Sequence, residues 1–139
     1  WSARGAFFKQ TGQNSATANL RAIGSYVYHA KMEGASGETW GWGLGPSGLL
    51  EKNRWYSVEQ HIRLNTPGNA DGILRAWVDG QLVFERNDIL FRNTDELKIE
   101  SVWMNVYHGG MTPPDTDLTL FIDNLVIARD YIGPMPNAE

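Results

Sequence analysis

The chain has 139 residues, 42% of them apolar and 20% charged, and its formal net charge at pH 7 is −4. This length and composition favour one globular domain and exclude a disordered chain. The acidic balance disfavours nucleic acid as a partner, because that binding needs a basic surface, and the absence of Cys excludes a disulfide framework and thiol chemistry.

The first residues read as a strand that has already begun. Residues 1–9 alternate Ser2 and Arg4 with small or apolar neighbours, so these two polar side chains share one face of a predicted strand. Because the chain opens inside this strand on Trp, and not on Met, we expect a further segment upstream of residue 1. A polar turn is predicted over residues 10–15.

Two more strands are predicted at 17–22 and 24–30, with Gly24 as a bend or bulge between them. The second strand holds Tyr26 and Tyr28, whose phenol groups share a face because side chains alternate along a strand. A strand that shows Ser and Arg on one face and a strand that shows two tyrosines on one face would together line a polar groove.

A long Gly-rich connection covers residues 31–48 and contains Trp40 and Trp42, two positions apart. Long connections of this kind are often functional, and flat indole rings suit the apolar faces of sugar rings. The alternative, in which both rings fill the edge of a β-sandwich core, stays open.

The middle of the chain reads as antiparallel strands. Residues 54–64 alternate over their whole length, with Gln60 as the single polar residue on the apolar face and His61 on the polar face. Alternation of this length predicts a half-buried strand.

A hairpin is predicted immediately afterwards. Residues 73–78 and 82–86 flank Asp79-Gly80, and an Asp-Gly pair between two apolar runs is a strong hairpin signal because the tight turn needs positive φ. Residues 89–91 read as a short strand or a turn of helix.

The last third of the chain repeats the alternating pattern. In residues 97–107 one face is polar and aromatic and includes Asn105 and Tyr107, and residues 117–128 read as a closing strand. A loop over 108–114 separates the two.

No segment shows a convincing helical pattern, and about nine or ten short strands between turns predict an all-β fold, whether sandwich, barrel or jelly roll. We place one domain over residues 1–134, with its first strands upstream of residue 1, and a tail over 135–139. No apolar run is long enough to span a bilayer, so we expect no membrane insertion.

Few kinds of chemistry fit the residues present. The three His are scattered without the spacing of metal ligands, so we expect no metal and no cofactor. Acidic residues occur, but nothing pairs two of them as a glycosidase requires. What remains is the set of Ser2, Arg4, Tyr26 and Tyr28.

These four residues suit β-elimination in a polymer of uronic acids. Arg4 would bind the carboxylate at C5, neutralise it and so acidify the C5 proton. A tyrosine whose pKa is lowered by nearby cations would transfer that proton. In the alternative, Tyr26 and Tyr28 are ordinary strand aromatics and Arg4 is a surface charge.

Six stretches resemble the family-14 polysaccharide lyases, which include alginate and glucuronan lyases with a β-jelly-roll fold. They are WSARGAF at 1–7, YVYHA at 26–30, RWYSVEQHIRLNTPG at 54–68, DGILRAWVDGQLVFE at 71–85, WMNVYHGG at 103–110 and FIDNLVIARDYIGP at 121–134. The resemblance covers the C-terminal two-thirds of such a domain. It implies a jelly-roll β-sandwich of two antiparallel sheets with a concave groove.

The resemblance also implies roles for the four residues. Ser2 and Arg4 match substrate-binding positions of the family, and Tyr26 and Tyr28 match positions that bind substrate and transfer protons. The family further uses a lysine on a strand upstream of the Ser-x-Arg strand, and residues 1–139 do not contain it.

Two hypotheses about function follow. The first is a secreted polysaccharide lyase that acts on alginate or glucuronan, with Arg4, Tyr26 and Tyr28 as catalytic residues and Ser2 as a substrate-binding residue. The second is a non-catalytic, lectin-like protein that binds an acidic polysaccharide or another glycan in the same groove. Weaker candidates for the groove wall are His29, His61, Asn105 and Tyr107. The sequence leaves the oligomeric state open.

Overall fold

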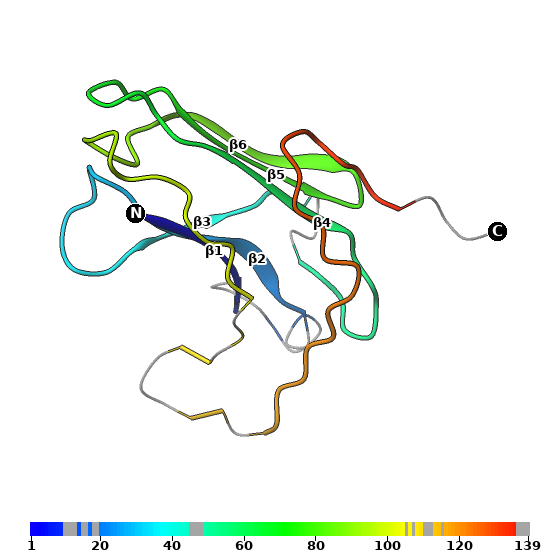
Figure 1. Cartoon of the computed structure of the whole chain (residues 1–139). Helices are drawn as coiled ribbons and strands as arrows, with labels where there is room; N and C mark the ends of the chain where they lie inside the picture. Colours follow the sequence, from blue (N-terminus) through cyan, green and yellow to red (C-terminus); the bar gives the residue numbers. More distant parts are fainter. Residues whose placement is uncertain are drawn as a thin grey trace.

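The described residues of the computed structural model form six strands and no helix (Figure 1). They are residues 1–9, 14, 17, 20–44, 49–104, 106, 108–109, 113–114 and 116–135. The strands are β1 (Ser2–Phe8), β2 (Ala22–Tyr28), β3 (Glu38–Gly41), β4 (Val58–Arg63), β5 (Gly72–Val78) and β6 (Gln81–Ile89). Over these residues there is accordingly no helix of the length and apolarity that crossing a membrane requires.

The strands make two three-stranded antiparallel sheets, in the orders β1-β2-β3 and β4-β5-β6. Figure 1 shows the two sheets as two layers. Ile23 and Val27 of β2 pack with Leu74, Ala76 and Val78 of β5 in two buried clusters that join the layers. An all-β fold built on two antiparallel sheets is therefore confirmed.

A buried polar network also links the two sheets. The Ser25 side chain is 0% exposed, and its hydroxyl donates to Gln60 Oε1 at 2.8 Å while accepting from Trp42 Nε1 at 3.1 Å. This contact explains why a single polar residue, Gln60, interrupts the apolar face of β4. It also places Trp42 in the core, where its ring is only 5% exposed.

A second buried side chain, Asn65, joins the turn after β4 to the segment after β6. Its Nδ2 donates to the carbonyl oxygens of Thr66, Asn69 and Arg92 at 2.9, 3.0 and 2.9 Å, and its Oδ1 accepts from the Arg92 amide at 2.9 Å. Asn65 is 0% exposed, so these contacts satisfy its polar atoms inside the protein.

The hairpin predicted around Asp79-Gly80 is confirmed. The two residues connect β5 to β6 with φ of 50° and 77°, the positive values that a two-residue hairpin turn needs. The Asp79 carboxylate accepts from the Ser57 amide at 2.9 Å and from Arg54 at 2.9 Å, which ties the turn to the segment before β4.

The prediction of a bend or bulge at Gly24 is wrong, because β2 runs through it without a register shift. A Cβ at Gly24 would lie 2.4 Å from the Trp40 carbonyl oxygen. Glycine is therefore needed for the close approach of β3 to β2, and not for a change of direction.

Other strand limits also differ from those predicted. β3 lies inside the connection expected over residues 31–48, and β4 is shorter than the strand expected over 54–64. In the strand expected at 17–22, Arg21 pairs with Leu50 as an isolated bridge, while residues 18–19 lie outside the described part. So do most of the predicted turn at 10–15, part of the loop at 108–114 and nearly all of the tail at 135–139.

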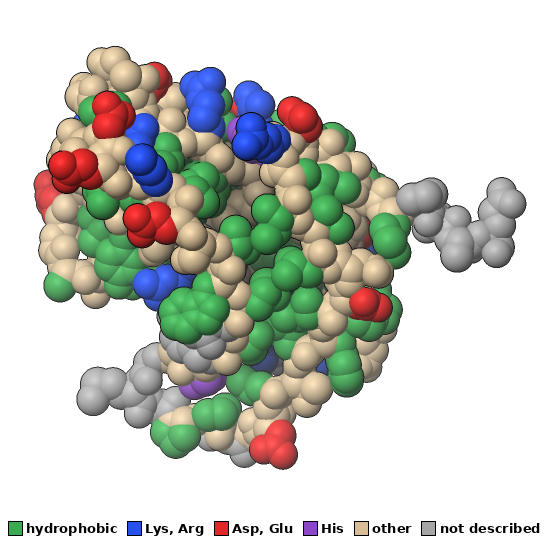
Figure 2. Space-filling view, viewed as in Figure 1, with side chains coloured by type: hydrophobic (Ala, Val, Ile, Leu, Met, Phe, Trp, Pro, Cys, Tyr) green, Lys and Arg blue, Asp and Glu red, His purple; other side chains and the backbone are tan. Residues whose placement is uncertain are grey.

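The strands predicted at 97–107 and 117–128 are absent from the described residues there. Their apolar side chains are exposed, with Trp103 at 80%, Phe121 at 73% and Ile127 at 69%. Alternation shows which side chains would share a face, but a strand also requires a neighbouring backbone that hydrogen-bonds to it. Figure 1 shows this stretch, yellow to orange, as an irregular trace beside the sheets, and Figure 2 shows apolar side chains exposed across the centre of the same view.

The chain then returns to the outer face of the β4-β5-β6 sheet. The Tyr131 ring lies 4.9 Å from the Trp77 ring, and the Glu59 carboxylate accepts from the amides of Ile132 and Gly133, each at 3.0 Å. Residues 131–133 thus cover part of this face, which is the side opposite the core.

Candidate functional site

The pairing of β1 with β2 brings together the four residues that the sequence singled out. Ser2 lies opposite Tyr28, and Arg4 lies opposite Tyr26. Directly opposed residues of an antiparallel pair share a face, and the alternate residues of β2, Ser25 and Val27, are buried in the core. The four side chains therefore form one cluster on the outer face of the sheet, which we call the tyrosine face.

Close contacts join the members of the tyrosine face. The Tyr26 and Tyr28 rings are nearly perpendicular, at 84°, with their centres 5.5 Å apart. The Arg4 guanidinium carbon is 5.4 Å from the centre of the Tyr28 ring. A cation so placed attracts the ring and is close enough to influence the charge of its hydroxyl.

The surroundings of Tyr28 lower its pKa below the usual value for tyrosine. The largest cause is a hydrogen bond with the Tyr26 side chain, and the nearby Gly37 backbone and the positive charge of Arg4 act in the same direction, while burial opposes them. All three favour the phenolate over the phenol. Tyr28 is therefore easier to deprotonate than an ordinary surface tyrosine.

Ser2 supplies a polar atom without a partner. Its Oγ is buried and makes no hydrogen bond within the described part of the structure. A buried hydroxyl of this kind carries an energetic penalty until a partner binds. It lies beside Tyr28, where a substrate hydroxyl or carboxylate would provide that partner.

His29 follows the strand but faces the other side. Its Nε2 is 3.2 Å from Glu38 Oε2, which also accepts from Trp40 Nε1 at 2.9 Å. Glu38 and Trp40 pair with Val27 and Ser25, the core-facing residues of β2. The Trp40 hydrogen bond first, and His29 second, lower the pKa of Glu38. This cluster therefore supports β3 from the core side and lies away from the tyrosine face.

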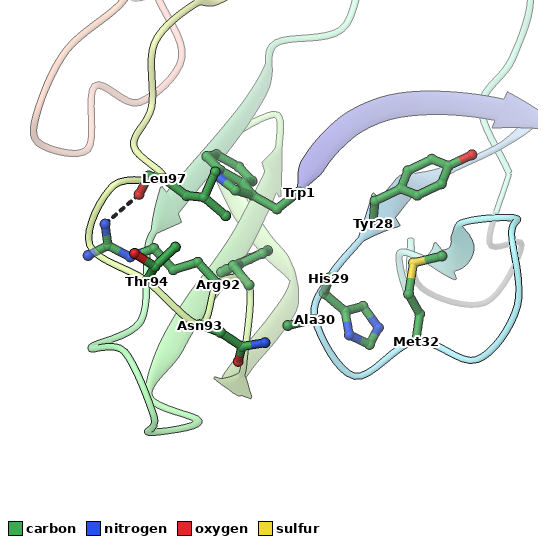
Figure 3. A pocket seen from close by; sticks show the side chains of 10 residues that line it. Trp1, Tyr28, His29, Ala30, Met32, Arg92, Asn93, Thr94 and Leu97 are labelled. Carbon is green, nitrogen blue, oxygen red and sulfur yellow. Dashed lines mark hydrogen bonds between the residues drawn. The ribbon is translucent and has the colours of Figure 1, made fainter.

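A pocket of about 360 Å³ opens at the end of β2 (Figure 3). It is lined by residues of three segments, among them Trp1, Tyr28, His29, Met32, Arg92 and Leu97. The Arg92 guanidinium donates to the carbonyl oxygens of Asn65 and Leu97 and lies near Asp95, so its charge is already engaged by the protein. In Figure 3 the Tyr28 ring points away from the other lining residues.

The comparison with known families identifies the chain. The family model described as Polysaccharide lyase 14 matches residues 1–118. The chain belongs to polysaccharide lyase family 14. No curated protein and no solved structure matches it.

Membership of family 14 confirms the resemblance drawn from the sequence and implies a polysaccharide substrate. The match contains both strands of the tyrosine face and ends before the stretch at 121–134 that we had included in the resemblance. In this family-14 chain the residues of the tyrosine face, which are the candidate site residues, lie on β1 and β2.

Of the weaker candidates of this family-14 chain, the structure describes His29 and His61, and neither joins the tyrosine face. His61 lies in β4, opposite Arg75 and on the outer face of the other sheet, so the structure separates it from the tyrosines. Asn105 and Tyr107 lie outside the described residues. Within the described ranges, no three His, Asp or Glu side chains gather as metal ligands would.

Sequence reasoning missed one residue that contacts the tyrosine face, Gly37, and one that supports β3 from the core side, Glu38. Gly37 donates its amide to Tyr26 Oη at 2.9 Å, and Glu38 begins β3 and holds His29 and Trp40. A possible signal was the Gly-rich stretch before Trp40, but only the pairing of β3 with β2 shows which glycine meets the tyrosines.

Proposed function

We propose that this family-14 chain cleaves a uronic-acid polymer, alginate or glucuronan, by β-elimination on the tyrosine face. The observation that supports this most is the cross-strand pairing of Ser2 with Tyr28 and of Arg4 with Tyr26. It groups a cation, a tyrosine of lowered pKa and an unsatisfied hydroxyl.

Arg4 is the group that makes the C5 proton acidic. Its guanidinium would hold the carboxylate attached to C5 through two hydrogen bonds and neutralise it. Electron density left on C5 after proton removal then spreads into a carboxylate whose charge is already balanced. Neutralising the carboxylate requires a cation, and Arg4 supplies it.

Tyr28 is the proposed base, because its surroundings lower its pKa. As phenolate it takes the C5 proton, the C5–H electron pair forms the C4–C5 double bond, and the C4–O4 bond breaks. The departing O4 receives a proton from Tyr28 or from Tyr26. The products are a 4,5-unsaturated uronate and a shortened chain with a free O4 hydroxyl. Ser2 Oγ would orient the sugar.

The proposal includes a wider architecture. We propose that the tyrosine face forms the wall of a concave groove in a jelly roll and that the protein is secreted. A groove suits a chain-like substrate. Because a polysaccharide does not cross the cell membrane, an enzyme that degrades it acts outside the cell.

The groups on the tyrosine face also favour one alternative. Two aromatic rings, a cation and an unsatisfied hydroxyl would bind a glycan even if the polymer stayed intact. The second candidate function is therefore lectin-like binding on the same face.

The test is to mix the purified protein with alginate and, separately, with glucuronan and follow the ultraviolet absorbance of the unsaturated uronate. We expect a steady rise that is reduced at least about a hundredfold in Tyr28→Phe and in Arg4→Ala, because each loses a group that acts in the transition state. Tyr131→Phe and Arg75→Ala, on the other sheet, are the matched controls and should keep the wild-type rate. Saturable binding without any rise would replace the lyase by the lectin-like function.

A further inference from the structure

The hairpin between β2 and β3 carries a backbone donor to the tyrosine face. Val27 and Glu38 are the last paired residues of these strands, and Gly37 comes next, where it would oppose Tyr28. Its amide donates to Tyr26 Oη at 2.9 Å. A main-chain N–H thus holds one of the two phenol oxygens.

Gly37 also leaves the space in which the two rings lie. A Cβ at this position would be 2.9 Å from Tyr28 Cε2, 3.0 Å from Tyr26 Cε1 and 2.9 Å from the Val27 carbonyl oxygen. Contacts this short require the rings or the strand to move. The φ of Gly37 is not among the positive values found in this chain, so close approach, and not backbone conformation, requires glycine here.

The residue after Gly37 is fixed from the opposite side of the sheet. Glu38 accepts from the Trp40 indole at 2.9 Å and lies 3.2 Å from His29 Nε2. The Trp40 ring in turn stacks on Phe84 and lies under the Arg86 guanidinium, 4.3 Å away. These contacts anchor the start of β3 to the core and so keep the Gly37 amide directed at Tyr26.

We propose that Gly37 is a positioning residue of the site: its amide holds the Tyr26 hydroxyl, and its missing side chain lets both phenol rings pack against the backbone. The lyase part of this inference rests on the proposed function. The Gly37 amide donates to Tyr26 Oη, and an oxygen that accepts from an amide can direct its own proton to a phenolate at Tyr28. Hydrogen bonds in such a chain strengthen one another.

Among the described residues, charged groups reach this pair mainly from β1. Arg4 reaches it from β1, whereas β3 places the uncharged Thr39 opposite Tyr26. The side chains of His29 and Glu38 lie on the core side of the sheet. Within the described part of the chain, Gly37 and Arg4 are thus neighbours through which the titration of Tyr28 can be changed without touching either tyrosine.

The test is to titrate the tyrosines by the ultraviolet absorbance of tyrosinate in the wild type and in Gly37→Ala, with Tyr28→Phe to assign the signal. We expect the pKa of Tyr28 to rise in Gly37→Ala toward the ordinary tyrosine value of about 10. Gly5→Ala is the matched control, because a Cβ there meets nothing within 4 Å, and it should titrate as the wild type does. A Gly37→Ala titration like that of the wild type would overturn the proposal.

Lyase assays of the same variants distinguish a role of Gly37 in positioning the tyrosines from a role in stabilising the fold alone. In Gly37→Ala we expect kcat to fall about tenfold to a hundredfold, with a smaller change in KM and a shift of the pH optimum to more alkaline values. An unchanged pH profile would contradict the proposed role. If the wild type forms no unsaturated product, the proposed function fails, while the tyrosine titration still decides whether Gly37 controls the pair.

A second measurement avoids the risk that Gly37→Ala does not fold. Amide hydrogen exchange at Gly37 should be slow in the wild type and at least about tenfold faster in Tyr26→Phe, which removes the acceptor and adds no bulk. Equal exchange rates in the two proteins would show that the Gly37 amide does not hold Tyr26, and the proposal would fall.

Discussion

Removing the Ser25 hydroxyl tests how the core supports the tyrosine face. Ser25 lies on the strand that carries Tyr26 and Tyr28, but on its buried side, between Gln60 Oε1 at 2.8 Å and Trp42 Nε1 at 3.1 Å. In Ser25→Ala the Trp42 N–H is left buried without a partner, at a cost of about 1–3 kcal/mol. The lost contact with half-buried Gln60 adds about 1 kcal/mol.

We therefore expect Ser25→Ala to lower the free energy of unfolding by about 2–4 kcal/mol. For a chain of this length each kcal/mol corresponds to about 3–5 °C in Tm, so Tm should fall by roughly 6–20 °C. Thermal and urea unfolding of the same samples would measure both quantities. Ser101→Ala, at an exposed serine, is the control and should stay within about 0.5 kcal/mol of the wild type.

A double-mutant cycle with Gln60→Leu sharpens the test. The single Gln60 variant leaves the Ser25 hydroxyl without its acceptor, whereas the double variant leaves only the Trp42 N–H unpaired. The double variant should therefore lose about 1 kcal/mol less than the sum of the two single variants. Strict additivity, or a Ser25→Ala loss below about 0.5 kcal/mol, would refute the reasoning.

Two further predictions concern the turn after β4 and the tyrosine face. Asn65→Ala should lower the free energy of unfolding, measured with urea, by about 3–5 kcal/mol, because three carbonyls and one amide lose their buried partner. The control is Asn69→Ala at an exposed neighbour, which should lower it by less than about 0.5 kcal/mol. Equal losses in the two variants would contradict this. Because the pKa of Tyr28 is lowered in the folded state, the unfolded chain keeps a proton that the folded chain releases between that pKa and about 10. The free energy of unfolding should therefore rise more steeply with pH in this window for the wild type than for Tyr28→Phe. Parallel pH profiles for the two proteins would contradict this.

The sequence predicted best where one local signal decides the structure. Asp79-Gly80 predicts a hairpin because the turn itself needs positive φ at both residues, and the structure has it there. The shared faces of Ser2 with Arg4 and of Tyr26 with Tyr28 follow from alternation alone. The sequence also suggested that these two faces together line a groove, but it did not predict the register in which β1 pairs with β2.

The failures concern partners that no local pattern specifies. Alternation over 97–107 and 117–128 was read as two strands, but the described residues there have no paired neighbour and expose Trp103 and Phe121. Gly24 and Gly37 are both required by close approach, to Trp40 and to the tyrosines respectively. Which glycine meets which residue depends on the register of β3, and the sequence of one strand does not contain that information.

The tyrosine face depends on the register of a single strand. In β2 the residues Ile23, Ser25 and Val27 are buried, while Tyr26 and Tyr28 point to the other side. A slip of one residue would bury the tyrosines and expose the core residues, so everything that fixes the buried side also fixes the site. Ser25 contributes most specifically, because its hydrogen bonds to Gln60 and Trp42 can form in one register only. A variant such as Ser25→Ala should thus reduce lyase activity through the position of Tyr28, although Ser25 itself touches no substrate.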